Sequence, residues 1–150
     1  MRPRNLKSKR RLALVLGSIA VLLLATLFTL WYFPGLTFRM VSVADGRNSW
    51  GQQWQTILFI RVSENMVSYE SETEARAAFE NKIAGAETII ERTKHPAGLA
   101  HVDEQVVGTY ILDTERRYSI VRLQGKSVYQ IYAPSLRYAW AFDRFRDRES

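Results

Sequence analysis

An uncharged, strongly apolar run extends from Leu12 to Phe33 and limits what this chain can fold into. As a helix rising about 1.5 Å per residue, the run covers roughly the 30 Å hydrocarbon core of a bilayer. Trp31 and Tyr32 stand at its C-terminal end, where amphipathic rings favour the membrane–water interface. A Pro-Gly pair follows and ends the helix. We therefore predict one transmembrane helix over residues 12–33, with the lipid bilayer as its partner.

Two other kinds of N-terminal apolar segment fit the run less well. A cleaved signal peptide has a similar charge pattern, but its apolar region is usually only about 7–15 residues long. The run ends in bulky aromatics and is followed by proline, and no small-residue cleavage motif is present. A buried helix of a soluble protein is rarely this long, this apolar and preceded by a basic segment. The length therefore favours an uncleaved anchor.

The formal net charge of +6 is concentrated before the apolar run. Residues 1–11 hold six basic side chains and no acidic one: Arg2, Arg4, Lys7, Lys9, Arg10 and Arg11. The other 21 − 6 = 15 basic residues balance 15 acidic ones, so the rest of the chain is formally neutral. Basic flanks stay in the cytoplasm. We expect a cytoplasmic tail at residues 1–11, an extracytoplasmic, periplasmic C-terminal domain, and no nucleic-acid partner.

Two absences bear on the compartment and cell type. The chain contains no cysteine, which excludes disulfides, thiolate metal sites and lipid acylation of a cysteine. It also contains no N-x-S/T sequon, because Asn48, Asn65 and Asn81 are each followed by the wrong residues. Both absences favour a protein of the bacterial envelope over a eukaryotic secretory protein.

The remaining sequence predicts a juxtamembrane segment at residues 34–55 and a small α+β domain at residues 56–150. Ser71 and Glu74 form a capping box at the start of a helix that we expect from Glu72 to Arg92. Ser135 can cap a final helix from Leu136 to about residue 145. The patterns predict strands at residues 36–43, 56–62, 104–112, 117–123 and 127–132, and turns at residues 45–46 and 124–126. The predicted order is β(β)-α-β-β-β-α, with helices on one face of an antiparallel sheet.

Side chains suited to metal binding or catalysis are few. His95, His101, Asp103 and Glu104 are close in sequence, but Pro-Ala-Gly separates the histidines and no fixed spacing such as HExxH occurs. The sequence has neither a GxSxG nucleophile elbow nor a glycine-rich phosphate loop. We therefore expect no enzyme activity, no metal and no cofactor.

Several aromatic residues are candidate contacts with the membrane interface or with a partner: Trp31, Tyr32, Trp50, Trp54 and Trp140. Alternatively, Trp50 and Trp54 cover the domain's own core, and the C-terminal aromatics pack between helix and sheet. Ala13 and Gly17 form a small-xxx-small pair that lets a second helix approach, although such residues are common in any transmembrane helix.

Taken together, the patterns predict a single-pass accessory or interaction protein that presents its outer domain to a larger membrane complex or envelope partner. The alternative is a membrane-tethered module that binds a small molecule or envelope polymer in an aromatic-lined cleft. That cleft would be lined by the following rings: Trp50, Trp54, Tyr110, Tyr129 and Trp140.

Overall fold

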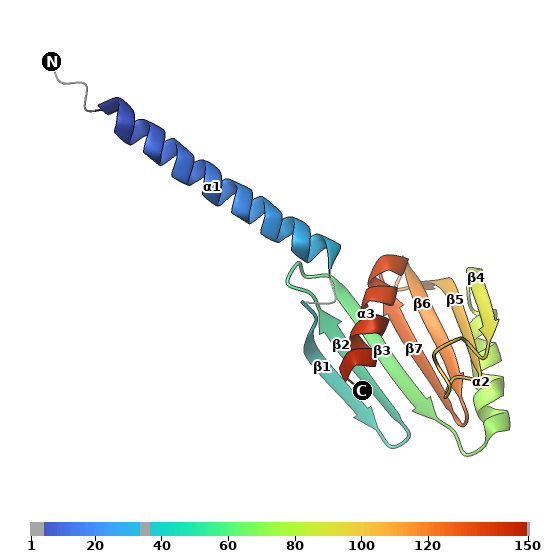
Figure 1. Ribbon diagram of the computed structural model, residues 1–150. Helices are drawn as coiled ribbons and strands as arrows, with labels where there is room; N and C mark the ends of the chain where they lie inside the picture. The colour runs from blue at the N-terminus through green and yellow to red at the C-terminus, as the bar shows by residue number, and fades with distance from the viewer. Residues whose placement is uncertain (1–4, 34–36, 150) are drawn as a thin grey trace. The chain divides into compact units, whose positions relative to one another are not determined.

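The computed structural model describes residues 5–33 and 37–149 and divides into two units, Met1–Phe33 and Pro34–Ser150. The first unit holds helix α1 (Asn5–Tyr32), and the second is an α+β domain (Figure 1). The stretch Arg11–Tyr32 of α1 is long and apolar enough to cross a membrane. The helix starts seven residues before the predicted boundary, because basic residues such as Lys and Arg are good helix formers. Residues 1–4 of the expected tail and the Pro-Gly pair lie outside the described residues.

A seven-stranded open sheet forms the centre of the domain, in the order β1-β2-β3-β7-β6-β5-β4. Every neighbouring pair of strands is antiparallel. The strands are β1 (Arg39–Gly46), β2 (Ser49–Gln55), β3 (Arg61–Ser68), β4 (Thr88–Lys94), β5 (Glu104–Leu112), β6 (Glu115–Gln124) and β7 (Ser127–Ala133), and the helices are α2 (Glu72–Ala84) and α3 (Leu136–Glu149). This architecture confirms the predicted α+β class and antiparallel sheet.

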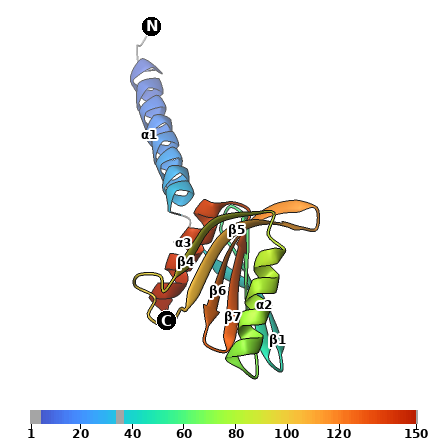
Figure 2. The same cartoon turned by 90° about the vertical axis from the view of Figure 1, so that its right-hand side faces the viewer.

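The two helices of the domain lie on opposite faces of the sheet, so the prediction of helices on one face is wrong (Figure 2). Phe142 of α3 shares a core with Ile120, whereas Phe79 of α2 shares a second core with Val121. Ile120 and Val121 are neighbours on β6, and successive side chains of a strand point to opposite faces. The central strands are therefore covered on both sides, and each face has its own apolar core.

The helix predicted from Glu72 to Arg92 is too long at its C-terminal end. Helix α2 begins as expected, with the backbone N–H of Glu74 donating to Ser71 Oγ at 3.2 Å. It ends at Ala84, where the N–H of Gly85 closes the last turn on carbonyl oxygens of that turn. The rest of the predicted helix is strand β4, which pairs with β5. Its Ile89-Ile90 pair fits a helical stripe and a β-strand equally well, so periodicity alone did not separate the two.

The strand predicted at residues 36–43 is present as β1, and residues 49–55, for which no strand was predicted, form β2. Strands β1 and β2 form a hairpin around residues 47–48, so residues 39–55 belong to the sheet rather than to a separate juxtamembrane segment. Residues 56–60 form the turn between β2 and β3, which corrects most of the strand predicted at residues 56–62. The domain order is therefore β-β-β-α-β-β-β-β-α.

Candidate interaction surface

The two ends of the sheet are defined by the direction of its strands. Strand β1 begins at one end, where Arg39 pairs with Gln55, and we call this the proximal end because it follows the apolar helix in sequence. The β2–β3 turn (56–60) and the β5–β6 turn (113–114) lie at the same end. The opposite, distal end holds the β1–β2 turn (47–48), the β6–β7 turn and the start of β5.

The β2–β3 turn holds its apolar side chains outward on a hydrogen-bonded frame. The backbone N–H of Phe59 donates to the Thr56 carbonyl at 2.9 Å, the Thr56 N–H donates to the Ile60 carbonyl at 3.0 Å, and the Ile60 N–H donates to Thr56 Oγ1 at 3.2 Å. Thr56 is buried, whereas Ile57 is 56% exposed and Phe59 is 73% exposed. Phe59 has φ = 61°, in the left-handed region that favours glycine or asparagine. The polar Thr56 thus faces inward, and Ile57 and Phe59 face solvent, while Ile60 packs against the core that contains Phe142.

A second projecting hairpin places exposed apolar side chains at the same end. Pairing of β5 with β6 continues to Leu112 and Glu115, beyond Ala133 where β7 ends (β5 and β6 are orange in Figure 2). Ile111 and Leu112 are exposed near the tip of this hairpin. Exposed arginines accompany the two turns: Arg39, Arg61 and Arg116. Arg116 is paired with Glu87, and the β5–β6 tip also exposes Asp113 and Glu115. The basic side chains beside an apolar tip are therefore Arg39 and Arg61 at the β2–β3 turn.

The two edges of the sheet are open. Every residue of β1 is exposed, including the apolar side chains of Met40, Val41 and Val43. Strand β4 closes the other edge in the strand order and exposes Ile89 and Ile90. A bulge between Met40 and Ser42 interrupts the pairing of β1 with β2. Unpaired backbone groups along such edges are available to another strand.

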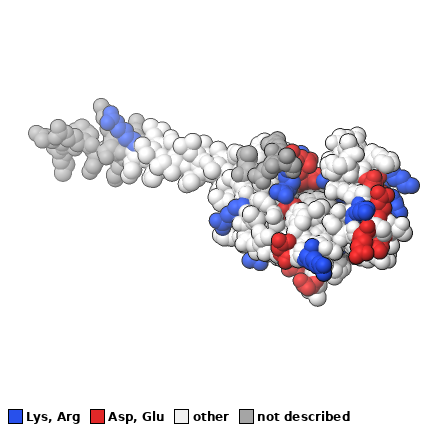
Figure 3. Space-filling model, turned by 90° about the horizontal axis from the view of Figure 1, so that it is seen from below, with Lys and Arg blue, Asp and Glu red and all other residues white. Residues whose placement is uncertain are grey.

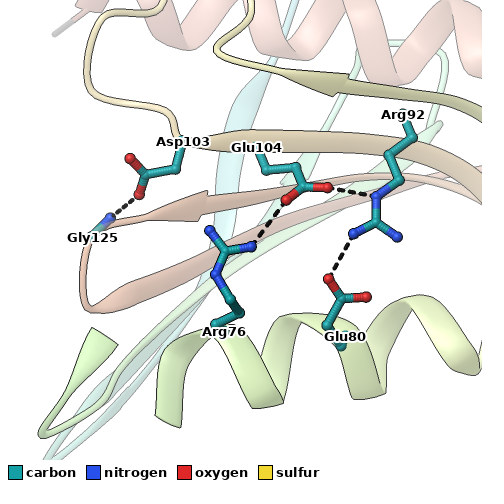
Figure 4. A network of polar contacts seen from close by, with 6 residues as sticks. All are labelled: Arg76, Glu80, Arg92, Asp103, Glu104 and Gly125. Atoms are coloured by element: carbon teal, nitrogen blue, oxygen red, sulfur yellow. Dashed lines mark hydrogen bonds and ion pairs between the residues drawn. The ribbon is translucent and has the colours of Figure 1, made fainter. Parts of the chain in front are cut away.

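At the distal end, a buried carboxylate is held by two arginines (Figure 4). Glu104 is only 1% exposed, and its oxygens lie 2.5 Å from Arg92 Nε and 3.1 Å from Arg76 Nη1. Arg92 Nη2 continues the network to Glu80 Oε1 on α2 at 2.6 Å. Burial alone would raise the pKa of Glu104, but the hydrogen bonds from Arg92 and Arg76 outweigh it and lower the pKa. The network therefore ties α2 to the edge of the sheet.

A cleft of about 390 Å³ lies beside this network and is lined by Glu72, Arg76, Lys94, His95, Asp103, Glu104, Leu123 and Gly125. Asp103 Oδ2 accepts the backbone N–H of Gly125 at 2.8 Å, so that carboxylate stabilises the β6–β7 turn. Among the side chains that the structure describes, no three of His, Cys, Asp or Glu are grouped as metal ligands. Acidic and basic residues are interspersed on the face seen from the distal side (Figure 3). The cleft thus carries no single-sign field for an ionic ligand.

On the α3 face, a second buried carboxylate fixes the aromatic core. Glu64 accepts hydrogen bonds from Trp54 Nε1 at 2.8 Å and from Tyr129 Oη at 2.7 Å, and Arg146 Nε lies 3.2 Å from it. Burial and the neighbouring Glu64 raise the pKa of Tyr129, which keeps its hydroxyl a donor. Trp54 is therefore an interior residue and offers no surface to a partner. The sequence pattern gave no sign of Glu64, since a carboxylate in a strand is usually exposed.

The aromatic-lined cleft of the alternative hypothesis is not formed, because its rings fill the domain interior. Trp54 and Tyr129 are buried in the α3-face core, and Tyr110 is buried in the α2-face core. Trp50 and Trp140 are half-buried against the α3-face core. The remaining predicted contact residues lie on α1, where Trp31 and Tyr32 are exposed.

Ala13 and Gly17 are also exposed on α1, and Gly17 has nothing within 4 Å of the position a Cβ would take. That face of the helix has room for the close approach of a second helix.

Comparison with known proteins does not identify a relative. No protein-family model matches the sequence, and no curated protein or solved structure matches it. The exposed proximal end and the open edges of the sheet are therefore the features that bear on function.

Proposed function

We propose that this chain is a single-pass membrane-anchored interaction protein that presents its domain, outside the cytoplasm, to a larger membrane complex or envelope partner. Two features support the anchor: the apolar stretch Arg11–Tyr32 and the basic residues that precede it. The lack of a catalytic motif in the sequence and the mixed charge of the distal cleft favour binding to a protein over chemistry on a substrate.

The observation that carries the proposal is the open edge strand β1. Soluble proteins protect such edges with charged residues, proline, a β-bulge or a covering element. Strand β1 has a bulge between Met40 and Ser42 and charged residues at Arg39 and Asp45, but it contains no lysine or proline and its central residues are uncharged. It exposes Met40, Val41 and Val43 instead. A partner strand added along β1 would satisfy its free backbone groups, and pockets on the partner would receive these side chains. We therefore place the partner's contact on the β1 edge.

Photo-crosslinking in native membranes tests this placement. A photoreactive residue at Val43, on the β1 edge, is compared with one at Asn48, in the exposed distal turn of the same hairpin. We expect Val43 to give a discrete crosslinked protein that co-purifies with the chain in mild detergent, and Asn48 to give much less of it. Monomer only at both positions, or equal crosslinking at both, would contradict the proposal.

A further inference from the structure

The β2–β3 turn exposes apolar side chains where hairpin turns normally carry polar ones. Residues 57–60 are four consecutive apolar residues, and Phe59 at 73% exposure is the most exposed large hydrophobic side chain among the described residues. Of these, Ile57 and Phe59 are exposed, whereas Leu58 is half-buried and Ile60 packs against the α3-face core. Exposed apolar side chains of this size weaken solubility unless they have a binding role. We therefore expect the exposed side chains of this turn to contact an apolar surface outside the domain.

Hydrogen bonds hold the turn in a defined conformation. Thr56 anchors it from the interior through the carbonyl and hydroxyl contacts to Phe59 and Ile60. A phenylalanine is kept at φ = 61°, although a left-handed conformation costs an L-residue with a Cβ about 1–2 kcal/mol. Strained residues of this kind persist where their side chain has a use, which here is an outward-facing aromatic ring.

The length of the chain restricts where this turn can be. Six residues lead from Phe33 to Arg39, and a chain spans at most about 3.6 Å per residue, or roughly 20 Å in total. Arg39 pairs with Gln55, the residue directly before the turn. The chain length therefore allows residues 56–60 to reach the membrane surface at which an anchor ending near Phe33 emerges.

The charges beside the turn also suit a membrane surface with anionic headgroups. Arg39 and Arg61 are exposed on either side of the turn. The neighbouring tip adds the apolar Ile111 and Leu112, together with the acidic Asp113 and Glu115, so the basic flank belongs to the β2–β3 turn. Apolar tips flanked by arginines fit the boundary between acyl chains and anionic headgroups. We propose that the proximal end of the sheet rests in the bilayer interface, with Ile57 and Phe59 among the acyl chains and the arginines at the headgroups. This inference depends on the membrane anchor of the proposed function.

Site-specific fluorescence on the full chain tests the contact. Because the protein has no cysteine, a single environment-sensitive probe can be attached at Ile57→Cys or, as the control, at Asn48→Cys in the distal turn. Each labelled chain is placed in vesicles of phosphatidylcholine and phosphatidylglycerol, with or without nitroxide-bearing lipid. We expect blue-shifted emission and strong lipid quenching at position 57, neither at position 48, and less quenching at 57 after Phe59→Ser.

Each other result overturns the inference. Water-like emission at position 57 would show that the turn stays in solvent. Emission that is blue-shifted without lipid quenching would show that a second copy of the chain covers it. Vesicle flotation separates the two proposals. If the chain floats with vesicles while position 57 remains in water, only the contact of the turn with lipid is contradicted. If the chain does not float, the membrane anchor is contradicted as well. Replacing phosphatidylglycerol by phosphatidylcholine should weaken the quenching if Arg39 and Arg61 meet headgroups.

Discussion

The proximal and distal ends of the sheet are built from the same strands but handle their side chains in opposite ways. At the distal end, Glu104, Arg76 and Arg92 satisfy one another within the domain. At the proximal end, Ile57 and Phe59 point into solvent and contribute little to either core. Charged groups are thus paired within the domain at the distal end, whereas apolar side chains are exposed to solvent at the proximal end.

This difference separates the requirements of folding from those of function. A domain buries apolar surface because that burial stabilises it, so exposed apolar tips are not explained by the fold. The distal network, in contrast, joins α2 to β4 and β5 and has a structural role. We therefore expect mutations at the two ends, and in the core between them, to differ in both size and sign.

The largest effect should come from the interior, where the same residue type serves as a reference for the proximal tip. Phe142→Ala removes a fully buried ring on the α3 face and should lower the free energy of unfolding by about 3–5 kcal/mol. Phe59→Ala should change it by less than about 0.5 kcal/mol, because the ring is exposed. Urea denaturation of the full chain in detergent, followed by tryptophan fluorescence, measures both. Comparable losses would show that the tip is part of the core.

An intermediate effect, dependent on pH, is expected at the distal end. Glu104→Gln should lower the free energy of unfolding at neutral pH by about 1–2 kcal/mol, since both arginine partners are partly exposed to solvent. The pairing lowers the pKa of Glu104 below its unfolded value of about 4.3, so its stabilisation is fully present above about pH 5. It is lost as the pH falls through the folded pKa.

The measurement is the urea midpoint of the original chain and of Glu104→Gln from neutral to acid pH. The difference between the two should shrink as the solution becomes more acidic. Burial raises the pKa of Asp143, whose protonation therefore favours the folded state at low pH and acts in the opposite direction. That contribution is common to both proteins and cancels in the difference. A difference in urea midpoint that stays constant with pH would contradict stabilisation of the distal end by the ion pairs of Glu104.

The smallest effect should have the opposite sign. Phe59→Asn places a residue that tolerates the left-handed conformation at φ = 61°, and should raise the free energy of unfolding by up to about 1 kcal/mol. The same urea measurement, with Ile57→Asn as a matched exposed control, detects this gain. A loss of stability in Phe59→Asn would mean that the ring supports the domain and would weaken the comparison between the ends.

The sequence was sufficient for elements whose signals were local. The apolar helix, the cap at Ser71, the three strands at residues 104–132 and the final helix follow from run length, capping and alternation. The exchange of helix for strand at Ile89-Ile90 did not follow, because β-branched residues at this spacing suit both structures. The pairing with β5 that decides between them is a long-range contact.

The strand predicted at residues 56–62 is mostly a turn, and the contacts of particular residues explain the difference. Residues 56–62 are rich in β-formers and apolar side chains, which is typical of a buried strand. The deciding contacts are hydrogen bonds from the buried Thr56, together with a positive φ at a phenylalanine, and neither is visible in composition. Glu64 is similar, since its burial depends on donors from Trp54 on β2 and Tyr129 on β7.

The most direct test of the membrane-anchored interaction protein is protease protection of a C-terminal epitope placed after Ser150. Right-side-out and inverted membrane vesicles are treated with a non-specific protease, and the epitope and the residual fragment are measured. A cytoplasmic basic flank and an outer domain predict that right-side-out vesicles lose the epitope, while inverted vesicles keep it. Loss of the epitope only in inverted vesicles, or recovery of the untreated chain in the soluble fraction, would contradict the account.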